Sequence, residues 1–156
     1  MAIAAKLKAY LDDEQVQYHV LAHHERFTSA EIAQALHVPG RMLAKVVVVK
    51  ADDRTLMVAL DANSRVDLTA LGEAVGAVSV ELASEDEMER QFPDCEVGAM
   101  PPFGNLYDLP VVVDTALSQD EEIVFEAGNH HEAIKLAYAD FDRLVHPTVA
   151  AVGLRD

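Results

Sequence analysis

The feature that most constrains the fold is a run of four valines that directly follows Lys45. Branched residues in an unbroken apolar run favour a β-strand covered on both faces, so we expect such a strand over residues 43–50. Alternation of side chains puts Lys45 on the face of Val47 and Val49, inside the run. An ammonium group there must reach a cleft, meet an anion or lose its proton. The alternative is that Lys45 extends past a strand edge into water, and the run alone leaves both open.

The rest of the chain predicts short helices and strands in alternation. The segment 52–54 connects two strands into a β-hairpin over residues 43–60. Asp67 is placed to cap one helix, and Ser84 with Glu87 forms a capping box at the start of another. Helices are expected over residues 3–11, 29–36, 68–75, 85–92 and 140–145, and further strands over 18–21, 78–82, 110–114, 122–126 and 133–137. This order predicts one α+β domain over residues 1–156, with a mixed, mostly antiparallel sheet.

The charge and cysteine content exclude several function classes. The net charge is −15, divided as −2 over residues 1–80 and −13 over residues 81–156, which argues against a long interface with a nucleic-acid backbone and against DNA as a partner. A local anion site fits only the first half, where Lys45 lies. Cys95 is the only cysteine, and no apolar stretch has the length of a signal peptide or membrane span. We therefore expect a cytoplasmic protein without a membrane partner.

A loop rich in glycine and proline forms the second feature that could carry chemistry. Residues 98–104 read Gly-Ala-Met-Pro-Pro-Phe-Gly, too broken for a helix or a strand interior. Glycine lets a backbone approach a ligand, and proline stiffens a loop whose remaining amide groups then point outward. Such amide groups can stabilise an oxyanion, at roughly 3–4 kcal/mol of barrier for each well-placed donor. A rigid surface connection is the equally acceptable structural interpretation.

Together these motifs resemble the YbaK/EbsC family of aminoacyl-tRNA deacylases, which share a fold with the editing domain of bacterial prolyl-tRNA synthetases. The matching marks are Lys45 on its valine-rich strand, the loop pattern Gly98-x-x-x-Pro102-Phe103-Gly104, Asp114 at the end of a strand, and the turn glycine Gly128. The resemblance covers nearly the whole chain. It implies a curved sheet or barrel flanked by helices.

The resemblance also implies a reaction and a set of site residues. The expected reaction is hydrolysis of the ester that joins a wrong amino acid to the 3′ end of a tRNA, with assistance from a ribose hydroxyl and no agreed side-chain base. Lys45 becomes the functional cation, and Met100 and Phe103 become candidates for the pocket wall. The expected substrate-binding residues are Gly98, Met100, Pro101, Pro102, Phe103, Gly104, Asp114, Gly128, His130 and, with less support, His24.

Histidine and cysteine side chains offer alternative chemistry. His19, His23 and His24 could meet His130 and His131 as metal ligands, yet no acidic or cysteine partner recurs at a firm ligand spacing. Cys95 lies between two acidic residues that raise a thiol pKa, so we interpret it as inert. We therefore expect no metal and no cofactor.

Three hypotheses follow. The favoured one is an editing deacylase that acts on the aminoacyl-tRNA 3′ end, with an aminoacyl-tRNA synthetase as a further partner. A non-catalytic module could bind tRNA ends or a synthetase through the same cleft, because the acidic second half could dock a basic partner. A metal-dependent hydrolase built on the histidine pairs is the third. The sequence does not identify the amino acid, the tRNA or the oligomeric state.

Overall fold

The computed structural model describes residues 4–23 and 29–155. Helices and strands alternate along the chain much as the periodicity predicts. The helices are α1 (Ala5–Asp13), α2 (Ser29–Leu36), α3 (Leu68–Val75), α4 (Glu85–Gln91), α5 (Thr115–Ser118) and α6 (Tyr138–Val145), with single 3-10 turns at Gly40–Met42 and Gly104–Leu106. The strands are β1 (Tyr18–Ala22), β2 (Leu43–Ala51), β3 (Arg54–Asp61), β4 (Arg65–Val66), β5 (Val80–Leu82), β6 (Val111–Asp114), β7 (Glu122–Glu126), β8 (Glu132–Ala137), β9 (Thr148–Ala150) and β10 (Gly153–Leu154).

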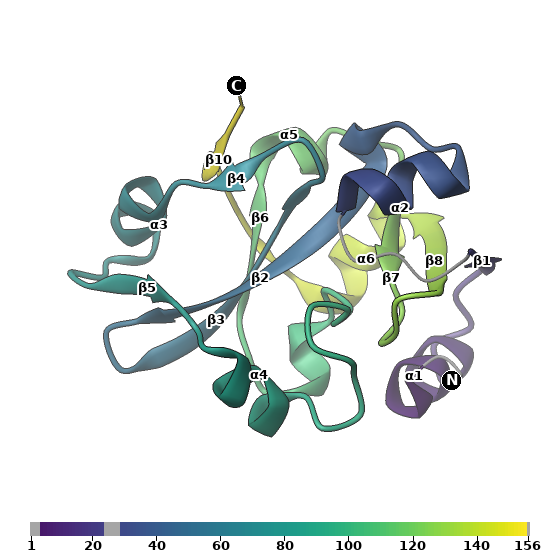
Figure 1. Ribbon diagram of the computed structural model, residues 1–156, viewed down its shortest axis with the longest axis horizontal. Coiled ribbons are helices and arrows are strands. Elements are labelled where there is room, and N and C mark those ends of the chain that lie inside the picture. The colour runs from purple at the N-terminus through teal and green to yellow at the C-terminus, as the bar shows by residue number, and fades with distance from the viewer. Residues whose placement is uncertain (1–3, 24–28, 156) are drawn as a thin grey trace.

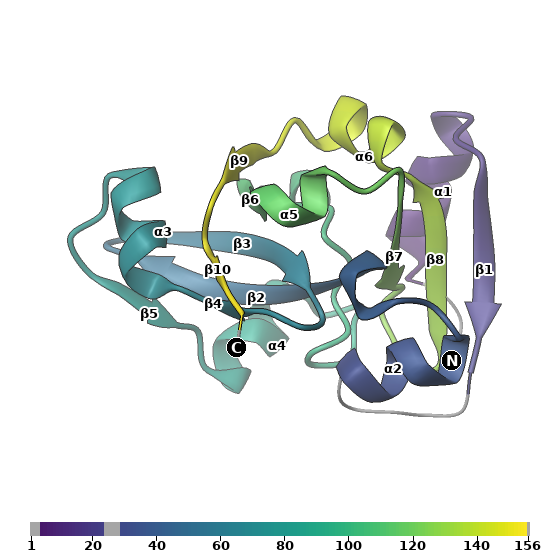
Figure 2. The same ribbon diagram turned by 90° about the horizontal axis from the view of Figure 1, so that it is seen from above.

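The strands of the described residues form a mixed sheet of eight and a separate pair. The main path runs β1-β8-β7-β2-β3-β6-β9, and β5 adds to β2 beyond the point where β7 ends its pairing. Pairing is antiparallel within β1-β8-β7 and β5-β2-β3, and parallel where β7 joins β2, β6 joins β3 and β9 joins β6. Strands β7 and β8 cross the direction of the β2–β3 hairpin (Figures 1 and 2), so the sheet is strongly curved. The predicted α+β fold with a mixed sheet is confirmed.

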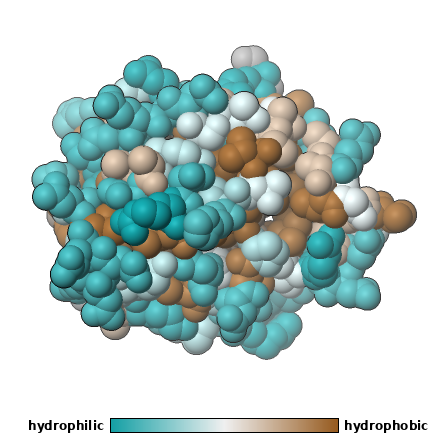
Figure 3. Space-filling view, turned by 180° about the vertical axis from the view of Figure 1, so that it is seen from behind, coloured by the Kyte–Doolittle hydropathy of each residue, from teal (hydrophilic) through white to brown (hydrophobic). Residues whose placement is uncertain are grey.

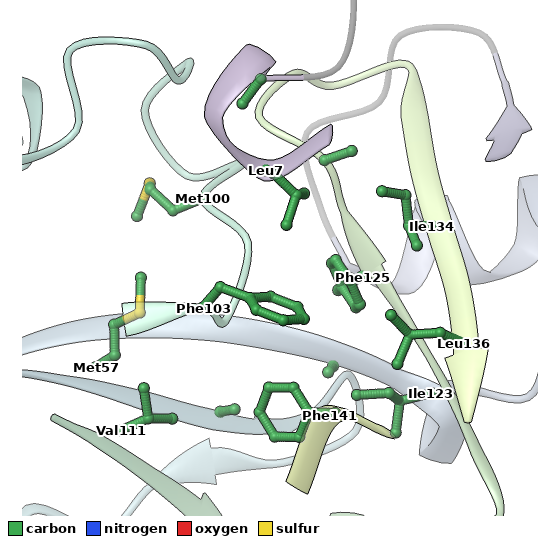
Figure 4. Packing of buried hydrophobic residues seen from close by; sticks show 14 of the residues in the cluster. Leu7, Met57, Met100, Phe103, Val111, Ile123, Phe125, Ile134, Leu136 and Phe141 are labelled. Carbon is green, nitrogen blue, oxygen red and sulfur yellow. The ribbon is translucent and has the colours of Figure 1, made fainter. Parts of the chain in front are cut away.

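Strand β2 is covered on both faces, as the valine run predicts. Ala44 and Val48 are buried in the largest hydrophobic cluster, while Val49 is buried in a second cluster on the opposite face. Figure 4 shows the centre of the largest cluster, where phenylalanine side chains from the loop, β7 and α6 meet residues of α1 and β8. The loop therefore has an anchor in the core as well as a surface stretch.

Local capping signals are confirmed in detail. The Asp67 side chain accepts a hydrogen bond from the Ala70 amide at 3.1 Å, and α3 begins there. The Ser84 hydroxyl accepts the Glu87 amide at 3.2 Å while the Glu87 carboxylate accepts the Ser84 amide at 3.1 Å, which completes the predicted capping box.

The outer surface is mostly hydrophilic on the side opposite to the view of Figure 1, with hydrophobic residues in separate patches (Figure 3). Within residues 4–23 and 29–155, none of the helices combines the length and the apolar character that crossing a bilayer would need.

Candidate active site at the open edge of strand β2

The candidate site lies where β2 loses its neighbour on one side. Strand β3 accompanies β2 from Ala44 to Ala51, but on the other edge β7 pairs only with Leu43 and Ala44. Strand β5 takes over only at Val49. In the described chain, residues 45–47 thus have no partner strand on that edge, and the sheet opens there.

A small pocket occupies this opening, and segments far apart in the sequence line it. Its volume of about 20 Å³ is room for one water molecule. The pocket brings Lys45 together with Gly98 and Met100 of the glycine–proline loop, as the motif analysis expects. Its lining residues are Leu43, Ala44, Lys45, Val46, Gly98, Met100 and Glu126.

Lys45 is half-buried in this pocket. Burial lowers the pKa of its ammonium group because the charged form loses solvation, and the negative charge of Asp61 partly opposes that effect. No carboxylate of the described residues lies within ion-pair distance of Lys45, whereas Lys50 on the same strand pairs with Glu87 at 3.1 Å. Of the two lysines on β2, Lys45 therefore has the cationic group that remains available to a ligand.

An apolar groove continues from the small pocket along β2. It has a volume of about 190 Å³ and shares Val46, Gly98 and Met100 with the pocket. Leu82 on β5 and Met88 on α4 form its far wall, and Leu82 is 58% exposed. A second hollow, of about 320 Å³, lies between α3 and β5 and includes none of the residues that line the Lys45 pocket.

The glycine–proline loop is clamped to the turn between β7 and β8. The Glu96 amide donates to the Gly128 carbonyl at 2.8 Å, and the Gly128 amide donates to the Ala99 carbonyl at 2.9 Å. Gly128 has φ +102°, and a Cβ atom there would lie 2.9 Å from the Cβ of Ala4. Only glycine fits this position. The predicted site residue Gly128 thus lies in the turn to which the loop is hydrogen-bonded.

Few loop amide groups can act as oxyanion donors. The Ala99 amide already donates to the Glu96 carbonyl at 3.0 Å, and Pro101 and Pro102 have none. The amide of Gly98, an exposed residue, donates to the Met100 sulfur at 3.3 Å, and a thioether is a weak acceptor that a ligand oxygen can replace. Of these four residues, Gly98 therefore has the amide group that a ligand oxygen can recruit most easily.

The C-terminal end of the loop packs into the hydrophobic core. Phe103 has no exposed surface, and its ring centroid lies 5.5 Å from those of both Phe125 and Phe141. A Cβ atom on Gly104 would approach the Leu109 carbonyl oxygen to 2.5 Å, so close backbone packing requires glycine there. Neither residue lines the pocket or the groove, and the same holds for Pro101 and Pro102.

His130 is buried below the loop, with 6% of its surface exposed. Its Nε2 atom lies 2.9 Å from the Val97 carbonyl, and its Nδ1 atom lies 3.1 Å from a carboxyl oxygen of Glu126. Burial, with the negative charge of Glu96, raises the pKa of Glu126 to about 8. Sequence reasoning missed Glu126. The available signal was an acidic residue at the inner end of a buried strand, four positions before His130.

Asp114 contacts the C-terminal segment of the chain. Its carboxylate accepts the amides of Val152 and Gly153, each at 2.9 Å, and receives Arg155 at 3.4 Å. Asp114 does not line the Lys45 pocket, so its predicted role at the substrate stays a prediction. His24 lies outside the described residues.

Two other candidates can be placed. The Cys95 thiol lies 3.4 Å from the Tyr107 hydroxyl, and burial raises its pKa to about 11. In the described part of the chain, no three histidine, cysteine or acidic residues are arranged to hold a metal ion.

Comparison with known proteins adds a family match. A model of the aminoacyl-tRNA editing domain matches residues 23–144. A proline–tRNA ligase of Bacillus cytotoxicus is 31% identical over 88 residues, which are 56% of this chain and 15% of the ligase. A proline–tRNA ligase of Bacillus cereus strain G9842 is 25% identical over 107 residues, 69% of this chain and 19% of the ligase. The chain thus matches less than a fifth of the length of either ligase.

Solved structures show the same fold at low sequence identity. Hypothetical protein APE2540 superposes with a TM-score of 0.86 at 20% identity, over 96% of this chain and 99% of that one. A candidate trans-editing enzyme for prolyl-tRNA synthetase superposes with a TM-score of 0.83 at 19% identity, over 97% and 96% of the two chains.

Proposed function

This chain belongs to the aminoacyl-tRNA editing domain family, and on that premise we propose that it hydrolyses the ester between a mischarged amino acid and the 3′ end of a tRNA, acting in trans. The observation that carries the proposal is the pocket at the edge of β2. Lys45 and Gly98 both line this pocket, which has room for one water. A cation, an amide donor and a water site are what hydrolysis of an activated ester needs.

The proposed reaction needs no side-chain nucleophile. A water oxygen attacks the ester carbonyl carbon, and the negative charge that develops on the carbonyl oxygen is stabilised by the Gly98 amide group. The bond from that carbon to the ribose oxygen then breaks. The ribose oxygen takes up one proton of the attacking water, and the amino acid leaves with the water oxygen and the other proton in its new carboxyl group. Lys45 holds the anionic or carbonyl end of the substrate in register.

The neighbouring groove suits the rest of the terminal aminoacyl-nucleoside. Its walls are mainly aliphatic, so an amino-acid side chain or an adenine face can displace water from them. The net charge of −15 disfavours wide contact with the tRNA backbone. The proposed partner is therefore the 3′ end alone, with a synthetase as a further candidate partner.

A deacylation panel tests the proposal. Purified protein should release amino acid from at least one mischarged tRNA, for example one of the Pro, Cys, Ala and Ser species. Lys45→Ala should lower the rate about 100-fold, the scale expected when one positioned polar group is removed from such a site. Lys50→Ala is the matched control, because that lysine lies on the same strand but pairs with Glu87.

The outcomes separate the hypotheses. If the wild-type protein leaves the whole panel intact, the hydrolase assignment is wrong. If Lys45→Ala then also weakens binding of a non-hydrolysable aminoacyl-adenosine, the non-catalytic module is the better description. Equal rates for Lys45→Ala and Lys50→Ala would contradict the role of Lys45. Circular dichroism of each variant checks that the fold is intact.

A further inference from the structure

We propose that Glu126 is a positioning residue of the hydrolytic site: its protonated carboxyl group donates a hydrogen bond to Nδ1 of His130 and so fixes the tautomer that holds the Gly98 loop. This inference rests on the proposed function and assigns Glu126, which also lines the Lys45 pocket, a role in holding the loop. The pair joins the end of β7 to the loop that carries the Gly98 amide group.

The tautomer follows from the hydrogen-bond acceptors. Nε2 of His130 lies 2.9 Å from the Val97 carbonyl oxygen, which can only accept, so Nε2 carries the hydrogen. In a neutral ring Nδ1 is then an acceptor, so the carboxyl oxygen 3.1 Å away can satisfy it only by donating. A protonated Glu126 can do so. One proton therefore lies between Nδ1 and the Glu126 carboxyl group, and it is bonded to the carboxyl oxygen.

Burial favours the arrangement in which both side chains are neutral. The side chains of His130 and Glu126 are only 8% and 12% exposed. An imidazolium–carboxylate pair would place two charges out of water, which is costly unless further hydrogen bonds satisfy them. The raised pKa of Glu126, about 8, agrees with a carboxyl group that stays protonated at neutral pH.

Charged groups relevant to Glu126 lie on the loop, on β2 and on β8. Glu96 in the loop raises the pKa of Glu126 through its negative charge. Lys45 lines the same pocket from β2. On the β8 side, Glu132 accepts a hydrogen bond from the Asn129 side chain at 3.2 Å. As pH rises through about 8, Glu126 loses its proton and the bond to His130 loses its donor.

The consequence for the reaction is geometric. Without the donor, His130 can change tautomer so that Nδ1 carries the hydrogen and faces the carboxylate, and the Val97 carbonyl then loses its partner. The Gly98 amide group, which follows directly in the chain, then leaves the oxyanion position. A displacement of about 1 Å at such a group can cost roughly 100-fold in rate. We expect this loss in kcat, with KM nearly unchanged.

Two substitutions separate hydrogen bonding from titration. Glu126→Gln keeps a donor that does not titrate, so it should retain at least a third of the wild-type kcat at pH 7. It should also remove the fall in rate that the wild type shows above about pH 8, after subtraction of uncatalysed hydrolysis. Glu126→Leu has no donor and should lower kcat by about 10- to 100-fold. Glu122→Gln, an exposed glutamate on the same strand, is the control.

A third substitution tests the influence of Glu96 on Glu126. Glu96→Gln removes the negative charge that raises the pKa of Glu126, so the alkaline fall in rate should move to lower pH. Wild-type rates in Glu126→Leu, or an unchanged alkaline fall in Glu126→Gln, would contradict the positioning role.

Nitrogen-15 NMR of the histidine rings tests the proton directly and does not depend on activity. At pH 7, His130 should show a protonated Nε2 and an unprotonated Nδ1, in the wild type and in Glu126→Gln, with a His130→Asn spectrum to assign the signals. A protonated Nδ1 would overturn the inference. If the tautomer is as expected but no mischarged tRNA is hydrolysed, the proposed function fails while the Glu126–His130 bond stands.

Discussion

At the scale of single residues, the sequence predicts which groups gather but not what each contributes. Lys45 and Gly98, which the motif analysis singles out, line one pocket. Phe103 has the same motif signal, yet it packs wholly into the core. Glu126 has no motif signal, because its importance depends on burial beside His130. Burial of one particular side chain is a tertiary property that a single sequence does not reveal.

Cys95 provides a prediction at this scale. Its raised pKa of about 11 leaves roughly 0.1% of the thiol as reactive thiolate at pH 8. We expect alkylation by iodoacetamide at pH 8 to be at least about 100-fold slower than for an unstructured cysteine peptide, because the thiolate is the nucleophile. Mass spectrometry over time measures the rate.

Unfolded protein in urea is the first control and should react at the peptide rate. Asp94→Asn is the second. Because the Asp94 carboxylate raises the pKa of the thiol, its removal should speed up labelling. Fast labelling of the folded wild-type protein would refute the inert interpretation of Cys95.

At the scale of elements, contacts between residues a few positions apart can be predicted from the sequence, whereas contacts between residues far apart in the sequence cannot. The caps at Asp67 and Ser84 are made by amides three positions away, and both are confirmed. Strands β9 and β10 were missed because they are short and lack periodicity. The segment between them is held by Asp114, which accepts the Val152 amide 38 positions away. No local pattern encodes that contact.

The loop that forms the site gives a prediction at the same scale. Gly104→Ala should lower the free energy of unfolding by about 2–3 kcal/mol, because a rigid core must yield to the new methyl group. The contact responsible is the Leu109 carbonyl oxygen, 2.5 Å from the added Cβ atom. Urea unfolding followed by circular dichroism provides the measurement.

Gly76→Ala is the matched control. Gly76 has φ +71° and nothing within 4 Å of an added Cβ atom, so only the backbone conformation is penalised, by about 1 kcal/mol. Equal losses for the two variants would show that the packing around Gly104 is looser than the structure indicates.

At the scale of the whole molecule, charge limits how a tRNA can be held. Under the proposed function, a net charge of −15 limits contact with the tRNA to a few phosphates. We therefore expect the logarithm of the tRNA binding constant to fall with the logarithm of salt concentration with a slope shallower than about −2, equivalent to no more than about three phosphates on a single strand. Fluorescence anisotropy between about 50 and 200 mM salt measures this slope.

Lysine variants of β2 locate the contact. Lys45→Ala should flatten the slope, and Lys50→Ala should leave it unchanged, because Lys50 is paired with Glu87. A slope of about −4 or steeper would mean that the protein grips a longer stretch of backbone than its surface charge allows.

The pocket at the edge of β2 also has a consequence for synthesis of the protein. Its walls come from Lys45, Gly98 and Glu126, which leave the ribosome one after another. A nascent chain that has exposed only its first lysine-bearing strand has no cavity, and one that ends before Glu126 lacks a wall. The pocket therefore exists only after translation has passed all three segments, so a growing chain cannot offer it to any ligand before that point.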